Sequence, residues 1–123
     1  MTPTDVKLHR ASGILELVYQ DETSFELSAE YLRVYSPSAE VQGHSPDQAV
    51  LQHGKKDIKI TDLLPQGHYA IKLVFSDGHD SGIFTWEYLF ELGRDYKHKW
   101  ADYLVRLEAA GKKRESQFIA VSR

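Results

Sequence analysis

A histidine among acidic residues is the part of this sequence best suited to chemistry. His79 follows the pair Asp77-Gly78 and precedes Asp80. An imidazole next to a carboxylate can transfer protons or ligate a metal ion, because the carboxylate orients and polarises the ring. The same residue types are common in tight turns, where their side chains bond their own backbone. The sequence leaves a reactive site and a turn as alternatives for this segment.

A metal site at His79 would need more ligands. His44 and Asp80 are the ligands that we assign to it, and His68 is a further histidine within the same predicted domain. No His-x-Asp or His-x-x-x-His spacing supports such a site. The chain has no cysteine, which excludes disulfides, thiol catalysis and metal centres held by its own thiolates. We therefore expect no cofactor, and weak metal binding through His44, His79 and Asp80 is the alternative.

Other reaction chemistry has no recognisable motif. The sequence lacks Gly-x-Ser-x-Gly and lacks a glycine-rich loop that ends in Gly-Lys-Ser/Thr. Glu87 and Glu91 lie four residues apart on a predicted helix, which is typical of a solvated face. We expect no catalytic residue. A small enzyme or ligand binder, with a pocket between sheet and helix, is a third hypothesis that lacks a nucleophile or base.

The segments around these residues predict short strands, because apolar and polar residues alternate in them. The strongest strand covers 68–75 and places Tyr69, Ile71, Leu73 and Phe75 on one face, at the centre of the sheet. The pair Asp77-Gly78 favours a tight hairpin turn after it. The other predicted strands cover 6–10, 14–19, 24–27, 57–64 and 82–84.

Helices are predicted from their end signals and apolar stripes. Ser28 can cap a short helix over 28–33, and Thr85 can cap one that Gly93 ends. The helix over 95–110 has apolar residues at i, i+3, i+4 and i+7. We expect four large residues of the last two helices in the core: Trp86, Leu89, Trp100 and Leu104.

These elements predict one α+β domain. It contains a twisted, mainly antiparallel sheet, with a short helix after the third strand and two C-terminal helices packed on one face. The domain should cover residues 1–111. Residues 112–123 read as a polar tail that we expect to be disordered in isolation.

Composition indicates the cellular compartment of the protein and the classes of partner that it can bind. No apolar run approaches the roughly 20 residues of a membrane span, and the first residues do not resemble a signal peptide. We therefore expect a cytoplasmic protein without a membrane partner. Basic residues outnumber acidic ones only in 94–123, where they are spread along a helix and tail. We do not expect nucleic-acid binding from such a distribution.

Three blocks of the sequence occur together in a known family. With the segments 25–44, 67–70 and 77–83 in this order, the chain resembles the gamma-butyrobetaine hydroxylase-like N-terminal domain family over about residues 5–110. Similar domains occur at the N-terminus of carnitine-pathway oxygenases and beside P-loop iron-sulfur carriers. The resemblance implies an accessory domain of unknown function, and the oxygenase chemistry belongs to a separate domain.

The resemblance also suggests where a metal would lie. In the oxygenases the similar domain holds zinc with three cysteines and a histidine. The cysteine positions fall on Ser36, Ser38 and Val41, and His79 matches the histidine. With three of the four ligands replaced, the resemblance implies a zinc-free fold in which hydrogen bonds take the place of the metal.

We therefore predict a non-enzymatic interaction or accessory domain. Its partner is expected to be a protein of the iron-sulfur carrier or iron-enzyme kind, and the sequence does not indicate an oligomeric state. The alternative function is iron or zinc binding through His44 and His79. The residues assigned to partner binding are Arg33, Tyr35, Ser36, Ser38, His44, Asp77, His79, Asp80, Ser81 and Tyr88.

Overall fold

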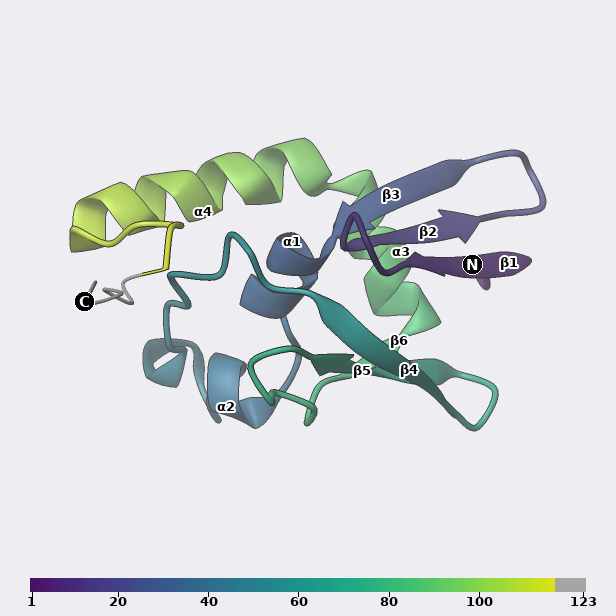
Figure 1. Cartoon of the computed structure of the whole chain (residues 1–123), viewed down its shortest axis with the longest axis horizontal. Helices are drawn as coiled ribbons and strands as arrows, with labels where there is room; N and C mark the ends of the chain where they lie inside the picture. The colour runs from purple at the N-terminus through teal and green to yellow at the C-terminus, as the bar shows by residue number, and fades with distance from the viewer. Residues whose placement is uncertain (117–123) are drawn as a thin grey trace, which may run out of the picture.

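The computed structural model of this chain describes residues 1–116 and has an α+β fold, as predicted (Figure 1). The strands form two three-stranded antiparallel sheets rather than one continuous sheet. The first sheet contains β1 (Asp5–His9), β2 (Ile14–Val18) and β3 (Ser24–Ser28), in this order. The second contains β4 (Ile60–Gln66), β5 (Ala70–Phe75) and β6 (Ile83–Thr85).

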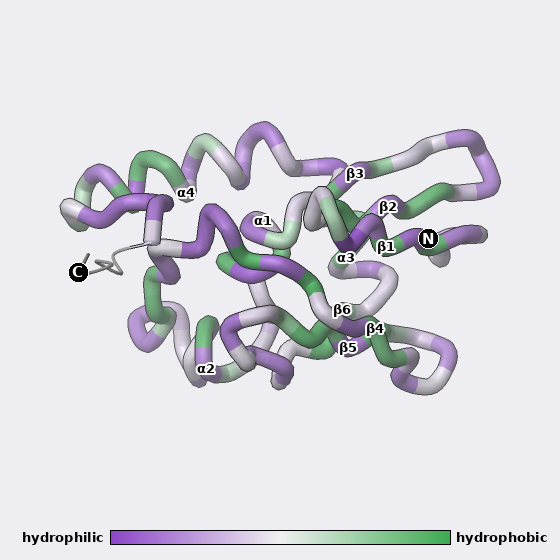
Figure 2. The backbone as a smooth tube through the Cα atoms, viewed as in Figure 1, coloured by the Kyte–Doolittle hydropathy of each residue, from purple (hydrophilic) through white to green (hydrophobic). Residues whose placement is uncertain are grey.

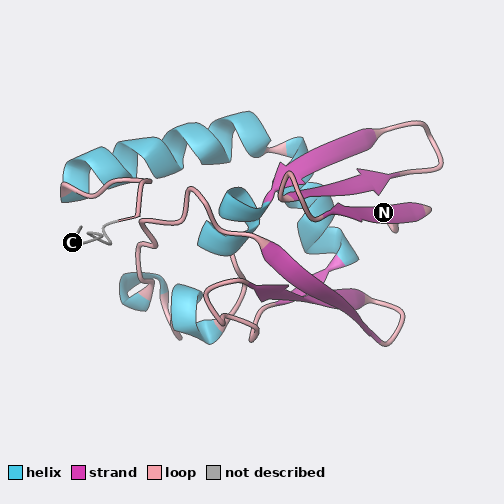
Figure 3. Cartoon of the chain, in the orientation of Figure 1, coloured by secondary structure: helices cyan, strands magenta, loops and turns pink. Residues whose placement is uncertain are grey.

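The helices lie between and beside the sheets. The short helices α1 (Ala29–Val34) and α2 (Ala39–Gln42) follow the first sheet, and a 3-10 turn, η1 (Pro46–Gln48), comes next. Residues 49–59 form a loop without helix or strand (Figure 3). The C-terminal helices are α3 (Trp86–Arg94) and α4 (Tyr96–Ala110). In Figure 1, α1 and α3 lie between the two sheets and α4 runs along the outside.

One hydrophobic core joins both sheets to α1 and α3. Leu17 of β2, Leu73 of β5 and Leu89 of α3 are completely buried in it. In Figure 2 apolar stretches follow the strands, whereas the turn between β2 and β3 is hydrophilic. The strand β5 lies between β4 and β6, as predicted for the strongest strand. Tyr69, assigned to the same buried face, is instead 61% exposed, because β5 begins only at Ala70.

The predicted helix caps are confirmed at the N-termini. The hydroxyl of Ser28 accepts a hydrogen bond from the amide of Tyr31 at 3.1 Å, and the hydroxyl of Thr85 accepts one from the amide of Tyr88 at 3.0 Å. Each hydroxyl satisfies an amide that has no partner within its helix.

The predicted end of α3 at Gly93 is wrong, because the helix continues through this residue to Arg94. A Cβ atom at position 93 would lie 2.3 Å from a ring carbon of Phe25. Glycine is therefore present to let α3 approach β3, and not to end the helix.

Helix α4 packs mainly on α1 and the loop after η1. Tyr103 and Leu107 are buried against Val34, and Trp100 and Leu51 complete this small cluster. Trp100 and Trp86 are partly buried, so the core prediction holds in part for them. It is wrong for Leu104, which is 39% exposed, because α4 is covered on one side only. None of the helices in residues 1–116 has the length and hydrophobicity that a membrane crossing requires.

The first residues of the predicted tail contact the domain. The amides of Gly54 and Lys56 donate to the carbonyl oxygens of Lys113 and Arg114 at 2.8 and 3.0 Å. Residues 112–116 thus run beside the loop before β4. The apolar residues Phe118, Ile119 and Val121, which belong to the same predicted tail, lie outside the described residues.

Candidate functional site

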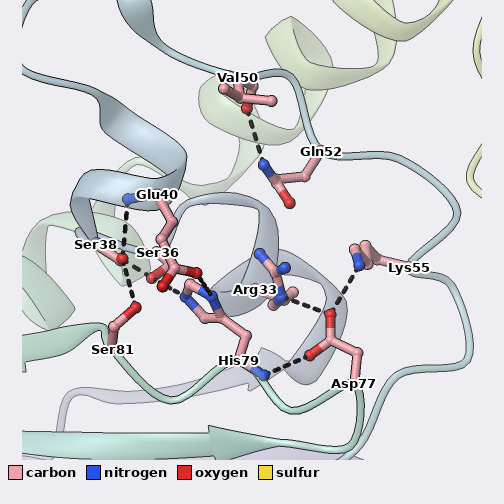
Figure 4. A network of polar contacts seen from close by, with 10 residues as sticks. All are labelled: Arg33, Ser36, Ser38, Glu40, Val50, Gln52, Lys55, Asp77, His79 and Ser81. Atoms are coloured by element: carbon pink, nitrogen blue, oxygen red, sulfur yellow. Dashed lines mark hydrogen bonds and ion pairs between the residues drawn. The ribbon is translucent and has the colours of Figure 1, made fainter.

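Two segments that are distant in the sequence meet at the candidate site. One is 33–41, from the end of α1 into α2, and the other is the loop 76–82 between β5 and β6 (Figure 4). The loop begins with the predicted turn, since the amide of Gly78 donates to the carbonyl oxygen of Phe75 at 2.9 Å. A Cβ atom on Gly82 would lie 2.3 Å from the hydroxyl oxygen of Ser36. Glycine at position 82 therefore permits the close approach of the two segments.

A closed cycle of hydrogen bonds links these segments. The hydroxyl of Ser36 lies 2.9 Å from Nε2 of His79, and Nδ1 of His79 lies 3.2 Å from a carboxylate oxygen of Glu40. The amide of Glu40 donates to the hydroxyl of Ser38 at 3.1 Å, and the amide of Ser38 donates to the hydroxyl of Ser36 at 3.3 Å. The hydroxyls of Ser38 and Ser81 lie 2.7 Å apart and extend the cycle into the loop. We call these five residues the serine-histidine cluster.

The hydrogen bonds assign the tautomer of His79. Glu40 is a carboxylate and can only accept, so the proton of the neutral ring lies on Nδ1. Nε2 then accepts from the hydroxyl of Ser36. Burial lowers the pKa of His79, and the charge of Arg33 lowers it further, against the opposing effect of the Glu40 and Asp77 carboxylates. The ring is therefore neutral at pH 7, and its contact with Glu40 is a hydrogen bond rather than an ion pair.

A charged group adjoins the cluster. One carboxylate oxygen of Asp77 accepts from Nε of Arg33 at 3.0 Å and from Nζ of Lys55 at 2.7 Å, and the other accepts from the amide of His79 at 3.1 Å. Burial acts to raise the pKa of Asp77. The hydrogen bonds from Lys55 and the His79 amide, with the charges of Arg33 and Lys55, outweigh it and lower the pKa to about 2. The side chain of Arg33 is only 8% exposed, so Asp77 is the counterion that permits its burial.

The structure brings six of the ten assigned partner-binding residues together: Arg33, Ser36, Ser38, Asp77, His79 and Ser81. Four of them are buried, so they support the surface residues and do not themselves face a partner: Arg33, Ser36, Ser38 and His79. Asp80 and Ser81 are exposed.

Tyr35 and Tyr88 form hydrogen bonds between the helices. The hydroxyl of Tyr88 donates to the carbonyl oxygen of Tyr35 at 2.6 Å, and the hydroxyl of Tyr35 donates to that of Lys99 at 2.6 Å. Both side chains are half-buried, and their hydroxyls tie α1 to α3 and α4. These hydrogen bonds give both tyrosines a structural role.

The three residues assigned to metal binding are not gathered into a site. His44 is exposed, and its backbone amide donates to the side chain of Gln48 at 3.1 Å. Within residues 1–116, no three side chains of the His, Cys, Asp and Glu types are close enough together to hold a metal ion. His44, His79 and Asp80 therefore do not form a set of metal ligands in this structure.

The residues at the position of the oxygenase zinc site do not fit zinc either. Ser36 and Ser38 offer neutral hydroxyls, and Val41 offers an alkyl group. Both ring nitrogens of His79 already have hydrogen-bond partners. Zinc in proteins is bound by thiolates, imidazoles and carboxylates, so this set lacks the donors that a zinc site requires.

Three residues that complete the site were not predicted from the sequence: Glu40, Lys55 and Gly82. Glu40 and Lys55 lie 39 and 22 residues from their partners His79 and Asp77. No spacing rule connects them. The one available signal was Gly82, a glycine inside a predicted strand, which is typical of a position where another part of the backbone or a side chain approaches closely.

Comparisons with other proteins agree with the fold. A family model described as gamma-butyrobetaine hydroxylase-like, N-terminal, matches residues 6–90. Two solution NMR structures are 50% and 45% identical to this chain and each cover 99% of it. The first is covered over 96% of its length with a TM-score of 0.82, and the second over 92% with a TM-score of 0.79.

A crystal structure from Acidithiobacillus ferrooxidans ATCC 23270 is also similar. It shows a protein of unknown function from the DUF971 family, which is 36% identical to this chain, covers 75% of it and is covered over 92% of its own length, with a TM-score of 0.63. A comparison with curated proteins gave no match.

Proposed function

This chain belongs to the gamma-butyrobetaine hydroxylase-like, N-terminal family, and from that premise we propose that it is an accessory domain that binds another protein rather than an enzyme. The surface that we assign to the partner is the exposed edge of the serine-histidine cluster. It consists of Glu40 and Ser81 of the cluster with Asp77 and Asp80 of the loop between β5 and β6, and we call it the acidic corner.

The position of Glu40 is the observation that supports this proposal most directly. Its side chain is 69% exposed, yet one carboxylate oxygen is bonded to His79, whose side chain is 3% exposed. A buried ring thus holds a solvent-facing carboxylate in one orientation. A partner that binds a fixed charge loses less side-chain entropy on association, which favours affinity.

The chemistry of the corner indicates the kind of partner surface. Glu40 and Asp80 supply the negative charge of the corner, because the charge of Asp77 is offset by its ion pairs with Arg33 and Lys55. Complementary charge then calls for lysine or arginine side chains on the partner, which also speed the encounter.

The burial of Ser36 argues for recognition over catalysis. Ser36, His79 and Glu40 are bonded in the order of a Ser-His-carboxylate triad, in which the hydroxyl bonds one ring nitrogen and the carboxylate bonds the other. Ser36 is completely buried, however, so a substrate could reach its hydroxyl only if the cluster opened.

The partner class comes from the resemblance. Domains similar to this one occur with oxygenases that use iron and with iron-sulfur carriers, so we propose an iron enzyme or an iron-sulfur carrier as the partner. The chain would act in the cytoplasm, where such proteins occur.

Affinity capture with charge-reversal variants tests the proposal. We expect the wild-type domain to capture an iron-containing protein from native cytosol. Glu40→Lys with Asp80→Lys should reduce its recovery at least about tenfold, as expected when like charges replace attraction at an interface. Glu108→Lys, on the exposed side of α4, is the matched control and should leave recovery unchanged. Equal recovery with all three proteins, or a captured partner without iron, would contradict the proposal.

A further inference from the structure

An arginine from the C-terminal segment occupies a site formed by Glu30 and Trp100 of the domain. Nη2 and Nε of Arg114 donate to the two carboxylate oxygens of Glu30 at 2.8 and 3.0 Å. The guanidinium carbon also lies 5.1 Å from the ring centroid of Trp100. A bidentate carboxylate and an aromatic face are the two partners that a guanidinium prefers.

The acceptor side of this site belongs to the folded body. Glu30 lies in the first turn of α1, and its side chain is only 6% exposed. Trp100 lies on α4, stacked beside Tyr96 with ring planes 11° apart. Both positions are set by helices that the core holds in place. A buried carboxylate of this kind needs a cation, because an unpaired buried charge is strongly destabilising.

The cation, in contrast, is supplied by a short segment. Arg114 follows the end of α4 at Gly111, and its side chain is 35% exposed. The segment is attached by two backbone hydrogen bonds to the loop 54–56 and by an ion pair of 3.6 Å between Lys56 and Glu115. These bonds involve exposed or half-buried residues outside the hydrophobic core, so the pairing of Arg114 with Glu30 is the contact that must be replaced when the segment detaches.

Space for a ligand exists next to the guanidinium. A cavity of about 350 Å³ lies between α1, α4 and the loop before β4, and its lining includes Glu30, Tyr96, Trp100 and Arg114. The cavity gives an incoming side chain access to the site beside Arg114.

We propose that Glu30 and Trp100 form a receptor for an arginine side chain of a protein partner, and that Arg114 fills this receptor when the partner is absent. The partner's arginine takes the place of Arg114, and residues 112–116 are released from the loop 54–56. This second surface is independent of the acidic corner.

The geometry explains why the ligand is arginine. A lysine ammonium can bond one oxygen of Glu30 but cannot present two parallel N–H groups to the carboxylate. The planar guanidinium does so while stacking on the indole of Trp100. In the free protein Arg114 competes at an effective concentration on the order of millimolar, as is usual for a tethered group, so a partner needs further contacts to displace it.

The test removes the Arg114 side chain from the site and adds a small arginine compound that can take its place. In the full chain with Arg114→Ala, we expect N-acetyl-arginine amide to bind saturably and to shift the indole N–H resonance of Trp100. Trp86, the second tryptophan of the chain, lies on α3 and serves as an internal reference. Binding should be at least about tenfold tighter than that of N-acetyl-lysine amide, and at least about tenfold tighter than to the wild type, whose site is filled.

Arg114→Ala leaves Glu30 without its cation and can unfold the domain. In that case N-acetyl-arginine amide should refold it and raise its melting temperature more than the lysine compound does, because a ligand of the native state stabilises that state. Adding Glu30→Gln removes the receptor charge and should abolish the preference for arginine. Equal effects of the two amides on Arg114→Ala, or no effect of either, would overturn the proposal.

Discussion

Nε2 of His79 lies 2.9 Å from the hydroxyl oxygen of Ser36, although 43 residues separate the two in the chain. Ser36 follows Tyr35, the C-cap of α1, and His79 belongs to the loop that leaves β5. Their contact is completely buried on the Ser36 side and joins the two halves of the site. The position of the acidic corner therefore depends on this hydrogen bond.

Ser36→Ala removes the hydroxyl that donates to His79 and that accepts from the amide of Ser38. Two buried polar groups then lose a partner, and we expect a loss of about 2 kcal/mol in the free energy of unfolding. Urea unfolding measures it. Ser24→Ala, at an exposed position of β3, is the control and should change stability by less than about 0.5 kcal/mol. Equal stabilities of the two variants would show that the contact contributes nothing.

His79 should titrate below its ordinary pKa of 6.5, since burial is the main cause of its shift. The unfolded chain then takes up this proton more readily than the folded one. The contribution of His79 to stability is therefore complete above pH 6.5 and is lost as the pH falls from there through the pKa of the folded state. The carboxylate of Glu40 opposes the shift, so Glu40→Gln should lower the pKa further.

NMR titration of the His79 ring protons measures both effects. A folded-state pKa above 6.5 would contradict burial as the main cause of the shift. An increase of that pKa in Glu40→Gln would contradict the assignment of Glu40 as the acceptor for Nδ1.

Gly93→Ala should destabilise the domain, although alanine is the better helix former by about 1 kcal/mol. The added methyl group would meet the ring of Phe25 at 2.3 Å, and overpacking of this kind typically costs about 1–3 kcal/mol. Thermal or urea unfolding measures whether the substitution lowers or raises the free energy of unfolding. In a Phe25→Ala background the same substitution should become stabilising, because the ring that it meets has gone. A stabilising effect in the wild-type background would show that α3 and β3 do not approach as described.

Local signals predicted much of the fold. Alternating residues located the strands, and Ser28 and Thr85 located two helix starts, since a cap bonds an amide three residues away. The end of α3 was misread because Gly93 resembles a helix end in sequence, while its contact with Phe25 is a tertiary one. The separation into two sheets was also missed, because strand patterns state which face is buried but not which strands pair.

The candidate site also depends on contacts between residues that are distant in the sequence, and sequence patterns do not reveal such contacts. His79 was singled out from its acidic neighbours in the sequence, and the family resemblance aligned Ser36 and Ser38 with it across the chain. Glu40 and Lys55 contribute through contacts across 39 and 22 residues, and neither has an unusual neighbour in the sequence. Only the folded chain shows that Glu40, on the exposed start of α2, reaches the ring of a buried histidine.

Cysteines at three positions should convert the cluster into a metal site. By the resemblance to the oxygenase domain, Ser36→Cys, Ser38→Cys and Val41→Cys supply three thiolates around His79. We expect the triple variant to bind about one equivalent of zinc, the number that a site of four ligands holds. Elemental analysis after purification without a histidine tag measures it, and the wild type, which lacks these donors, should retain less than about a tenth of an equivalent. Zinc retained equally by both proteins would contradict the replacement of metal by hydrogen bonds.

The most direct measurement is the mapping of the captured partner onto the isotope-labelled domain by NMR. Binding through the acidic corner predicts that amide shifts concentrate in residues 38–44 and 77–82, and that they disappear with Glu40→Lys and Asp80→Lys. Shifts concentrated elsewhere, for example around Tyr69 and Trp86, with none in these two segments, would contradict it.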